Sequence, residues 1–470
     1  MKQIKDELQS ILATPLDPTT PDFFHPLLEQ IDAPLLVESA VTFGTPHYLL
    51  DLDRLKERAS CFIHTMRQHL PNSHFFYAFK CNDLPYLIKT LKETGFQADV
   101  ASLFELKLAL KLGFERIVFN SPGKTNEELT LAINEKKRVS INLDNPEELE
   151  RMLILAAELS PHRKVPVGFR LNSELSVGGT KKWSKFGFDL EQLKEAVLRV
   201  EESAHLQWTG LHFHASFNKT PDKYVENIKV IGQFLSYHFG AKQLSKLRYF
   251  DIGGGFYPEH QAILHKGEDQ GMLVDMLLER GMDKTRLSHQ YPFDPYAFRI
   301  TPVEPLQNFA LAIGETLKQH ILPFNPDMAI YFEPGRFIVT PSTTILLRVM
   351  AVKKESVIVD GGINMLGDYK FAEYSFAPLL NVTHPSEQLV RKTIYGSLCD
   401  PHDIWGYSYY GEDLQVGDVL AVPQQGAYTF SSAWRFIKAI PAYIAVTNRQ
   451  FIIAREAETF ENRYAGCKMG

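Results

Sequence analysis

Eight short apolar runs between about residues 45 and 340 constrain the fold of this chain more than any other feature. They alternate with segments in which apolar residues recur at helical spacing, as at positions 84, 87, 88 and 91. The runs cover residues 74–80, 98–102, 117–120, 139–144, 165–172, 210–215, 249–255 and 329–335. Eight strand-like runs alternating with helices of this length predict an α/β fold, a (β/α)₈ barrel of the TIM type.

The length of 470 residues exceeds what one compact core usually holds, so we expect two domains. We predict an N-terminal extension over residues 1–45 and a barrel over residues 46–340. Residues 258–305 are longer than a barrel connection needs and predict an insertion near the barrel mouth. Short strand-like runs separated by turn residues predict a β-rich second domain over residues 341–470, of barrel or sandwich type, with which the extension packs. These runs cover residues 345–350, 357–360, 394–395 and 419–422.

Composition and charge limit the classes of binding partner and the cellular location that we expect for this protein. The formal net charge of −6 gives no basic footprint, so we expect no nucleic acid partner. The four cysteines are widely scattered, which fits a reducing compartment better than a disulfide framework. The charged N-terminus lacks an apolar stretch of signal-peptide length, and no run approaches the ~20 apolar residues that span a bilayer. We therefore expect a cytoplasmic protein without a membrane partner.

Lys80 stands at the end of the first apolar run, where barrels of this type gather their chemistry. Burial against apolar neighbours disfavours the charged form of a lysine and lowers its pKa. A neutral amine can form a Schiff base with an aldehyde, as pyridoxal phosphate (PLP) requires. The alternative is a strand-end lysine that simply reaches water.

The ends of the seventh and eighth apolar runs carry further candidate site residues, for binding a phosphate and for supplying a carboxylate. Three glycines at positions 253–255 end the seventh run, where the backbone N–H groups of such barrels often bind phosphate. The alternative is a plain tight turn. Glu333 and Arg336 end the eighth run, with Gly335 between them. Glu333 could keep a pyridine nitrogen protonated and Arg336 could neutralise a phosphate, unless the two form an ordinary salt bridge.

His212 and His214 alternate along the sixth run, so both face the same side of the strand. They could be metal ligands, as in barrel amidohydrolases, with Asp99 and Asp251 in support. They could also be internal histidines, or one could stack on a cofactor ring. No clear third histidine completes a metal site, so we favour stacking for His214 and expect no metal.

Residues 396–403 form a candidate loop far along the chain from Lys80. Cys399 lies beside Asp400 and near Asp403, a set that could combine a proton donor with carboxylates for an ammonium group. The alternative is a surface loop of turn-forming residues.

Together these motifs resemble the fold-type III PLP-dependent decarboxylases, which include the diaminopimelate, ornithine, lysine and arginine decarboxylases and share a barrel with alanine racemases. The likeness covers roughly residues 45–440. The matching stretches are Tyr77-Ala78-Phe79-Lys80-Cys81-Asn82, Asp99-Val100-Ala101-Ser102, Lys185-Phe186-Gly187, His212-Phe213-His214-Ala215-Ser216, Gly253-Gly254-Gly255-Phe256, Glu333-Pro334-Gly335-Arg336, Cys399-Asp400 and Gly426-Ala427-Tyr428.

The resemblance implies a role for each matching residue. Lys80 would hold PLP covalently, His214 would stack on the ring, and Glu333 would pair with the pyridine nitrogen. The remaining cofactor contacts, mostly to the phosphate, would come from Asp99, Ser216, Gly253, Gly254, Gly255, Gly335, Arg336 and Tyr428. Cys399 would donate a proton, and Asp400, with Asp403 nearby, would contact the distal ammonium of the substrate. Cys399 and Asp400 would reach the partner's site in an obligate homodimer with shared active sites.

A departure from the family pattern bears on the substrate. Diaminopimelate decarboxylases usually carry an arginine shortly after a stretch like residues 360–364, and here Met365-Leu366-Gly367 follows without one. A second substrate carboxylate would then lack its partner. We therefore expect a diamino acid with one carboxylate, lysine or ornithine, with D-lysine and D-ornithine included. The alternatives are meso-diaminopimelate and a catalytically silent homologue that binds a partner.

Overall fold

The structure is a computed structural model that divides into two compact units. The barrel unit holds Leu55–Pro258 and Val303–Val339, and the sheet unit holds Met1–Arg54, Glu259–Pro302 and Thr340–Gly470. The described residues are 31–172, 185–259, 262–263, 299–300, 303–367, 377–406 and 408–468. In these ranges no helix combines the length and the apolar character needed to cross a membrane.

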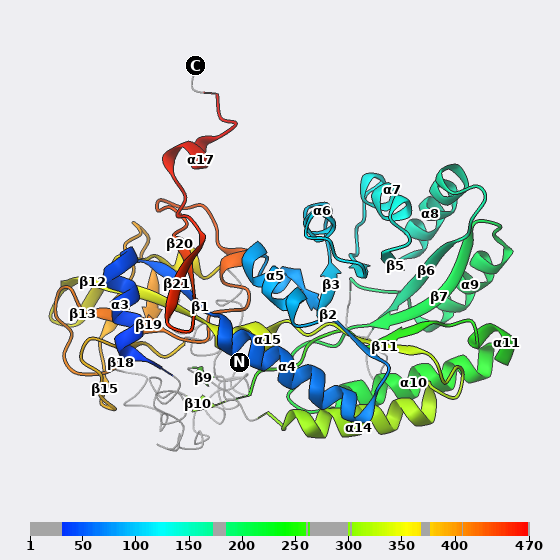
Figure 1. Cartoon of the computed structure of the whole chain (residues 1–470), viewed down its shortest axis with the longest axis horizontal. Coiled ribbons are helices and arrows are strands. Elements are labelled where there is room, and N and C mark those ends of the chain that lie inside the picture. The colour runs from blue at the N-terminus through cyan, green and yellow to red at the C-terminus, as the bar shows by residue number, and fades with distance from the viewer. Residues whose placement is uncertain are drawn as a thin grey trace, which may run out of the picture. The chain divides into compact units, whose positions relative to one another are not determined.

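Eight parallel strands close into a barrel in the first unit (Figure 1). Each of the eight apolar runs overlaps one of them, so the predicted barrel is confirmed. The strands are β2 (Ser73–Ala78), β3 (Gln97–Val100), β4 (Ile117–Asn120), β5 (Val139–Leu143), β6 (Val165–Leu171), β7 (Leu206–Phe213), β8 (Tyr249–Asp251) and β11 (Ala329–Phe332).

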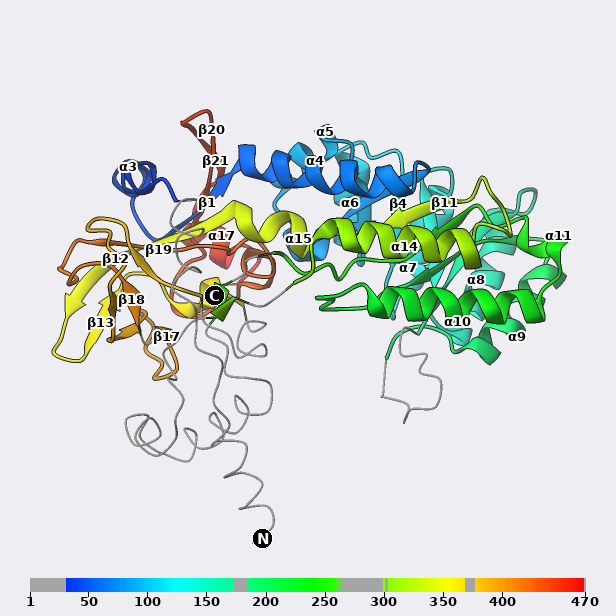
Figure 2. The same ribbon diagram turned by 90° about the horizontal axis from the view of Figure 1, so that it is seen from below.

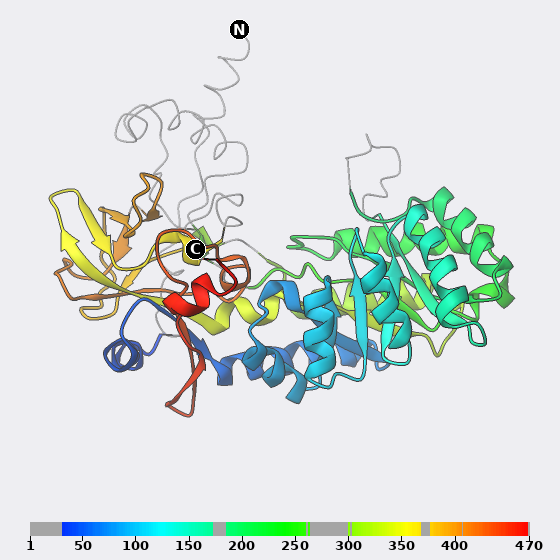
Figure 3. The same cartoon turned by 90° about the horizontal axis from the view of Figure 1, so that it is seen from above.

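Helices cover the outside of the barrel, and α10 and α14 lie side by side in two views (Figures 1 and 2). The helices that follow the first strands, blue to cyan, succeed one another along the unit (Figure 3). The helices are α4 (Leu52–His69), α5 (Pro85–Glu93), α6 (Leu103–Lys111), α7 (Asn126–Asn134), α8 (Pro146–Leu159), α9 (Leu190–Glu202), α10 (Asp222–His238), α11 (Ala241–Leu244), α14 (Leu306–His320) and α15 (Arg336–Val339).

Local sequence signals explain where these helices begin. Ser102 accepts a hydrogen bond from the backbone N–H of Glu105 at the start of α6. Thr125 and Glu128 form a reciprocal capping box at the start of α7. Such caps satisfy backbone donors that the first helical turn leaves unpaired. β3 and β4 therefore pass into α6 and α7 at defined points, which fixes the loops at the carboxyl ends of these two strands.

The second unit is mostly sheet, as predicted, with an 11-stranded sheet among its described residues. β1 lies between β12, to which it is antiparallel, and β20, to which it is parallel. Residues 47–51, which we had assigned to the barrel domain, therefore belong to this sheet. Its strands are β1 (His47–Asp51), β12 (Thr343–Val352), β13 (Ser356–Val359), β14 (Leu380–Asn381), β15 (Leu389–Val390), β16 (Thr393–Tyr395), β17 (Ile404–Gly406), β18 (Tyr409–Tyr410), β19 (Val419–Val422), β20 (Ala442–Thr447) and β21 (Gln450–Arg455).

Part of the predicted extension packs on this sheet. Helix α3 (Ala33–Phe43) buries Leu36 and Ala40 in one apolar cluster with sheet residues such as Leu346. Residues 1–30 of the extension and most of the predicted insertion lie outside the described residues. Within the insertion, β9 (Ala262–Ile263) pairs antiparallel with β10 (Arg299–Ile300).

His47 on β1 gives a stability prediction. Its Nδ1–H donates to the carbonyl of Gly44 at 2.6 Å, and its Nε2 accepts from Ser39 Oγ at 2.8 Å, so the buried ring is neutral. Burial lowers the pKa of His47 from 6.5 to about 4. The unfolded chain therefore takes up a proton first as the pH falls, and we expect His47 to cost stability progressively between pH 6.5 and 4, by up to about 3 kcal/mol.

Thermal unfolding at several pH values measures this effect. The His47→Gln variant should unfold with a shallower dependence on pH than the wild type across that window. His162→Gln, at an exposed histidine, is the matched control. Equal slopes for wild type and His47→Gln would contradict the prediction.

Candidate active site

Lys80 lies at the carboxyl end of β2, in the short 3₁₀ turn η2 (Phe79–Cys81). The buried residues of β2 and of this turn anchor the backbone, while 39% of the lysine side chain remains exposed. Its Nζ lies 3.7 Å from Oδ2 of Asp99. Burial lowers the pKa of Lys80, but the charges of Asp99 and Glu333 outweigh burial and raise that pKa above its ordinary value. The expectation that apolar neighbours keep this amine neutral is therefore wrong for this structure.

Glu333 follows β11 and is buried beneath the barrel mouth. Its Oε2 lies 3.4 Å from Nε2 of His212 and 3.8 Å from Nδ1 of His214, and Asn120 donates a hydrogen bond to its Oε1. Burial opposes its charge, but the contact with His212 and the positive charge of Lys80 hold the pKa of Glu333 well below its usual range. The barrel therefore contains one deeply buried carboxylate that stays ionised.

Two other buried acids flank Glu333. Burial and the charge of Glu333 raise the pKa of Asp99 to about 7 and raise the pKa of Asp251 well above its usual range. Oδ1 of Asp251 accepts the backbone N–H of Gly253 at 2.9 Å. Asp99 is thus only partly ionised near neutral pH, and burial with the charge of Glu333 disfavours the charged form of Asp251 as well, which concentrates the negative charge on Glu333.

The two histidines bear on the metal alternative. His212, His214 and Glu333 place one potential ligand atom each within 4.8 Å of one another. However, the N–H of Gly254 donates to Nδ1 of His214 at 3.1 Å, so that lone pair is already engaged. Burial lowers the pKa of His214 to about 4, which leaves a neutral ring whose face can pack on a planar ligand. A neutral imidazole is also the form that binds a metal, so stacking by His214 stays a prediction.

The loops after β7, β8 and β11 carry the predicted phosphate residues of the barrel unit at one end of the barrel, whereas Tyr428 belongs to the sheet unit. Ser216 is exposed on the first loop, and the backbone N–H of Asn218 on that loop donates to the carbonyl of Gly255 at 2.8 Å. The guanidinium of Arg336 lies 5.5 Å from the ring of Phe217 on the same loop. Glycine is required at 255 because φ is +88° and a Cβ would collide with the carbonyl of Ala215.

Two of the three glycine N–H groups already have acceptors in the protein, namely Asp251 for Gly253 and His214 for Gly254. Their predicted phosphate contact stays a prediction. At Gly335 a Cβ would lie 2.9 Å from Sγ of Cys81, so the absence of a side chain lets the end of β11 pack closely beside the lysine turn.

Sequence reasoning missed several polar residues inside the barrel. Asn120 and Asn142 lie at or near the carboxyl ends of β4 and β5, and Asn142 donates to Oδ1 of Asn120 at 2.8 Å. Arg170 near the end of β6 lies 3.8 Å from Oδ1 of Asp144 and 4.2 Å from the ring of Phe186. Asn120, Asn142 and Arg170 all lie near the carboxyl ends of their strands. A search of the strand ends that included amide side chains and the fifth run would have found them.

Three of the predicted site residues, Cys399, Asp400 and Tyr428, lie in the sheet unit. Cys399 is exposed, and Asp400 accepts the backbone N–H of His402 at 2.9 Å. That hydrogen bond lowers the pKa of Asp400, so its carboxylate is ionised. Tyr428 has a φ of +57° and accepts a hydrogen bond from Ser432 through its carbonyl. Their predicted contacts with cofactor and substrate stay predictions.

Asp403 has a clear structural partner set. Its Oδ1 accepts the backbone N–H of Ile363 at 2.8 Å, and its Oδ2 accepts the N–H of Leu398 at 2.6 Å. The buried carboxylate thus holds the loop that carries Cys399. Its predicted substrate contact stays a prediction.

Substitution of Asp403 separates its structural role in holding the loop from its predicted role in binding substrate. Asp403→Ala leaves two donors without this acceptor, so we expect the free energy of unfolding to fall by about 1–3 kcal/mol per donor. Asp400→Ala, at a neighbour with 34% of its side chain exposed, should lower stability less. Calorimetry measures both variants, and an Asp403→Ala protein as stable as the wild type would speak for a role in binding alone.

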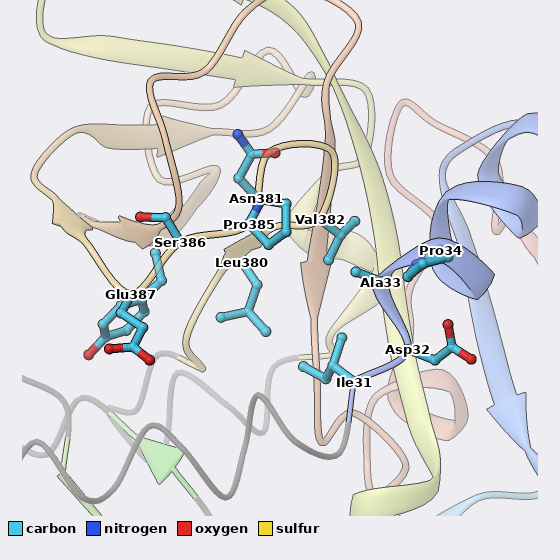
Figure 4. Close-up of a pocket in the computed structure, with 11 residues that line it drawn as sticks. Ile31, Asp32, Ala33, Pro34, Leu380, Asn381, Val382, Pro385, Ser386 and Glu387 are labelled. Carbon is cyan, nitrogen blue, oxygen red and sulfur yellow. The ribbon is translucent and has the colours of Figure 1, made fainter.

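A separate cavity of about 550 Å³ lies in the sheet unit between α3 and β14 (Figure 4). Leu380, Val382 and Ile31 give it apolar walls. Its polar groups are engaged, since Asp32 pairs with Arg449 and Oδ1 of Asn381 accepts the N–H groups of residues 383 and 384. It holds none of the side chains that the sequence analysis singled out.

Comparisons with known proteins extend over both units. Residues 56–280 match the family model described as "Pyridoxal-dependent decarboxylase, pyridoxal binding domain". A diaminopimelate decarboxylase of Aquifex aeolicus is 27% identical over 462 residues, which cover 93% of this chain and 96% of that protein. A chloroplastic ornithine decarboxylase of Nicotiana glutinosa is 27% identical over 413 residues, which cover 83% of this chain and 81% of that protein.

Among solved structures, a diaminopimelate decarboxylase from M. jannaschii in complex with L-lysine superimposes with a TM-score of 0.75 at 23% identity. The match covers 92% of this chain and 94% of that one. The likeness in fold therefore spans the barrel and the sheet unit alike.

Proposed function

We propose that this chain, a member of the fold-type III pyridoxal-dependent decarboxylase family, removes carbon dioxide from a basic diamino acid to give a diamine. The observation that carries the proposal is the pairing of a reachable amine with a buried, ionised carboxylate in one barrel mouth. Lys80 is 39% exposed beside Asp99, and Glu333 is buried with a pKa held well below its usual range.

The residues of the mouth fit PLP. The cofactor supplies an aldehyde for the lysine amine and a ring that withdraws electrons while its nitrogen is protonated. Glu333 offers the buried negative charge that such a nitrogen needs. His214 offers a neutral ring for stacking, and the loops at Ser216 and Arg336 offer a hydroxyl and a positive charge for phosphate.

The chain's own groups account for the proton movements. The raised pKa of Lys80 means that its amine must pass a proton to a neighbour before it can act as a nucleophile. Asp99 is 3.7 Å away with a pKa of about 7, so it can accept that proton near neutral pH. The lowered pKa of Glu333 keeps its carboxylate ionised, and this charge would favour a protonated ring nitrogen in bound PLP.

We assign the sheet-unit residues to the substrate side of the site. The exposed Cys399 would give a proton to the carbon that loses carbon dioxide, and the ionised Asp400 would attract the distal ammonium. In this proposal the two residues serve the barrel of a second copy in a homodimer with shared sites, and the enzyme works in the cytoplasm. The exposure of Cys399 and the 34% exposed side chain of Asp400 support their availability to a partner.

Lysine or ornithine is the favoured substrate class. Met365 and Leu366 occupy positions at which the diaminopimelate enzymes usually have an arginine, so a second substrate carboxylate would lack its partner. The relatives include decarboxylases named for diaminopimelate and for ornithine. The proposal includes both the L and the D enantiomers of lysine and ornithine. The alternative substrate is meso-diaminopimelate.

The test is carbon dioxide release by the purified protein loaded with PLP. Both enantiomers of lysine and ornithine, with arginine and meso-diaminopimelate, form the panel. We expect release from lysine or ornithine and little from meso-diaminopimelate. Release from meso-diaminopimelate alone would replace the substrate class, and a PLP-loaded protein that releases none from the panel would support a silent homologue. A protein that takes up zinc and no PLP would support a barrel hydrolase.

A further inference from the structure

A row of register partners crosses the barrel interior on five neighbouring strands. Tyr249 on β8 pairs with Gly210 on β7, which pairs with Gly168 on β6. Gly168 pairs in turn with Asn142 on β5, which pairs with Asn120 on β4. Such partners lie at one level of a parallel barrel, where their side chains can form a continuous layer.

The two glycines in this row make room for the tyrosine. The hydroxyl of Tyr249 donates to Oδ1 of Asn142 at 2.6 Å, two strands beyond its nearest neighbour. A Cβ at Gly210 would overlap the ring of Tyr249, and a Cβ at Gly168 would overlap its hydroxyl and Oδ1 of Asn142. The side chain of Tyr249 therefore lies across β7 and β6 and connects β8 with β5.

The chain of hydrogen bonds continues to the ionised carboxylate. Nδ2 of Asn142 donates to Oδ1 of Asn120 at 2.8 Å. Nδ2 of Asn120 donates to Oδ1 of Asp99 at 3.0 Å and also to Oε1 of Glu333. The reverse orientation of the Asn120 amide would set its carbonyl against two carboxylates, so each link has one favourable direction.

Every member of this chain is buried, which makes its hydrogen bonds strong and their loss costly. Burial also raises the pKa of Tyr249 well above its ordinary value, so its hydroxyl remains a donor across the working pH range. Asn120 in turn bridges two acids whose charges repel each other, which favours the ionised form of Glu333.

We propose that Tyr249 is a positioning residue that acts through Asn142 and Asn120 to hold Glu333 in its place and in its ionised form. The proposal rests on the proposed function, because it concerns the carboxylate assigned to the ring nitrogen of PLP. Without the hydroxyl, Oδ1 of Asn142 loses this donor, and the two amides are less firmly oriented toward Glu333.

The test compares Tyr249→Phe with Tyr331→Phe. Tyr331 stacks on Tyr249 with ring centroids 4.7 Å apart and planes 5° apart, so the control removes a hydroxyl from the adjacent ring and leaves the described chain of donors intact. Phenylalanine keeps the ring volume in both variants. The readouts are kcat and KM for carbon dioxide release, the acid limb of the kcat pH profile, and the pH titration of bound PLP absorbance without substrate.

For Tyr249→Phe we expect kcat to fall about tenfold, with KM within about twofold of wild type. The acid limb and the absorbance titration should both move upward by about one pH unit, because Glu333 holds its charge less well. Tyr331→Phe should match the wild type in all of these readouts.

Equal titrations and equal kcat for the two variants would overturn the inference while leaving the proposed function intact. A parallel loss of kcat in both variants, with no shift in the titration, would reduce Tyr249 to a packing role and overturn it as well. A wild-type chain that takes up no PLP would instead overturn the proposed function, and this inference with it.

Discussion

The Lys80→Ala variant is expected to lose at least about 10³-fold in turnover, because it removes the amine that we propose bonds to the cofactor. Borohydride treatment followed by peptide mapping should place the reduced cofactor on Lys80 in the wild type. The same treatment should leave the variant without a covalent label, while PLP still binds reversibly through its phosphate. Activity and mass spectrometry together measure the effect.

Lys107→Ala is the matched control, since this lysine lies on α6 of the same unit with 58% of its side chain exposed. It should keep both turnover and the label at position 80. Full turnover in Lys80→Ala, or a label on another lysine of the wild type, would contradict the assignment of the amine.

The Glu333→Gln variant is expected to retain PLP but to lose about 10²–10³-fold in kcat. Glutamine keeps the shape of the side chain while removing the buried charge that the contact with His212 and the charge of Lys80 stabilise. A neutral amide holds a proton on the facing nitrogen poorly, so the ring withdraws electrons less well. The absorbance of bound PLP should change with the loss of rate.

Glu315→Gln on α14, at an exposed glutamate, should leave both readouts at wild-type values. Glu333→Asp keeps the charge on a shorter side chain and should recover part of the lost rate. If Glu333→Gln decarboxylates as fast as the wild type, the buried carboxylate does not serve the ring nitrogen.

The barrel was predictable because its signal is local. Each run, such as 117–120, is rich in apolar residues, since a strand buried on both faces needs such residues, and helical spacing lies between the runs. The rule that chemistry gathers at strand ends then located Lys80, His214 and Glu333, which the structure brings into one mouth. The assignment of β1 to the second sheet was not predicted, because the sequence of a short apolar strand does not indicate which sheet it joins.

The interior polar chain could not be predicted from the sequence. Tyr249 and Asn142 are 107 positions apart, and their contact depends on two glycines on intervening strands. The direction of the lysine pKa shift was also misjudged, because the carboxylates that raise it come from β3 and from the end of β11. Contacts between distant segments depend on register and barrel closure, which a local pattern does not encode.

The order and spacing of apolar runs, and the identity of the polar residue that ends each one, were determined by the sequence alone. Local hydrophobicity and backbone preference act within a few residues, so they can be read along the chain. The tertiary structure decided which acid stays ionised, which N–H groups are engaged and how Tyr249 reaches Asn142. Those properties depend on burial and on the charges that surround each group, and only closure of the barrel sets them.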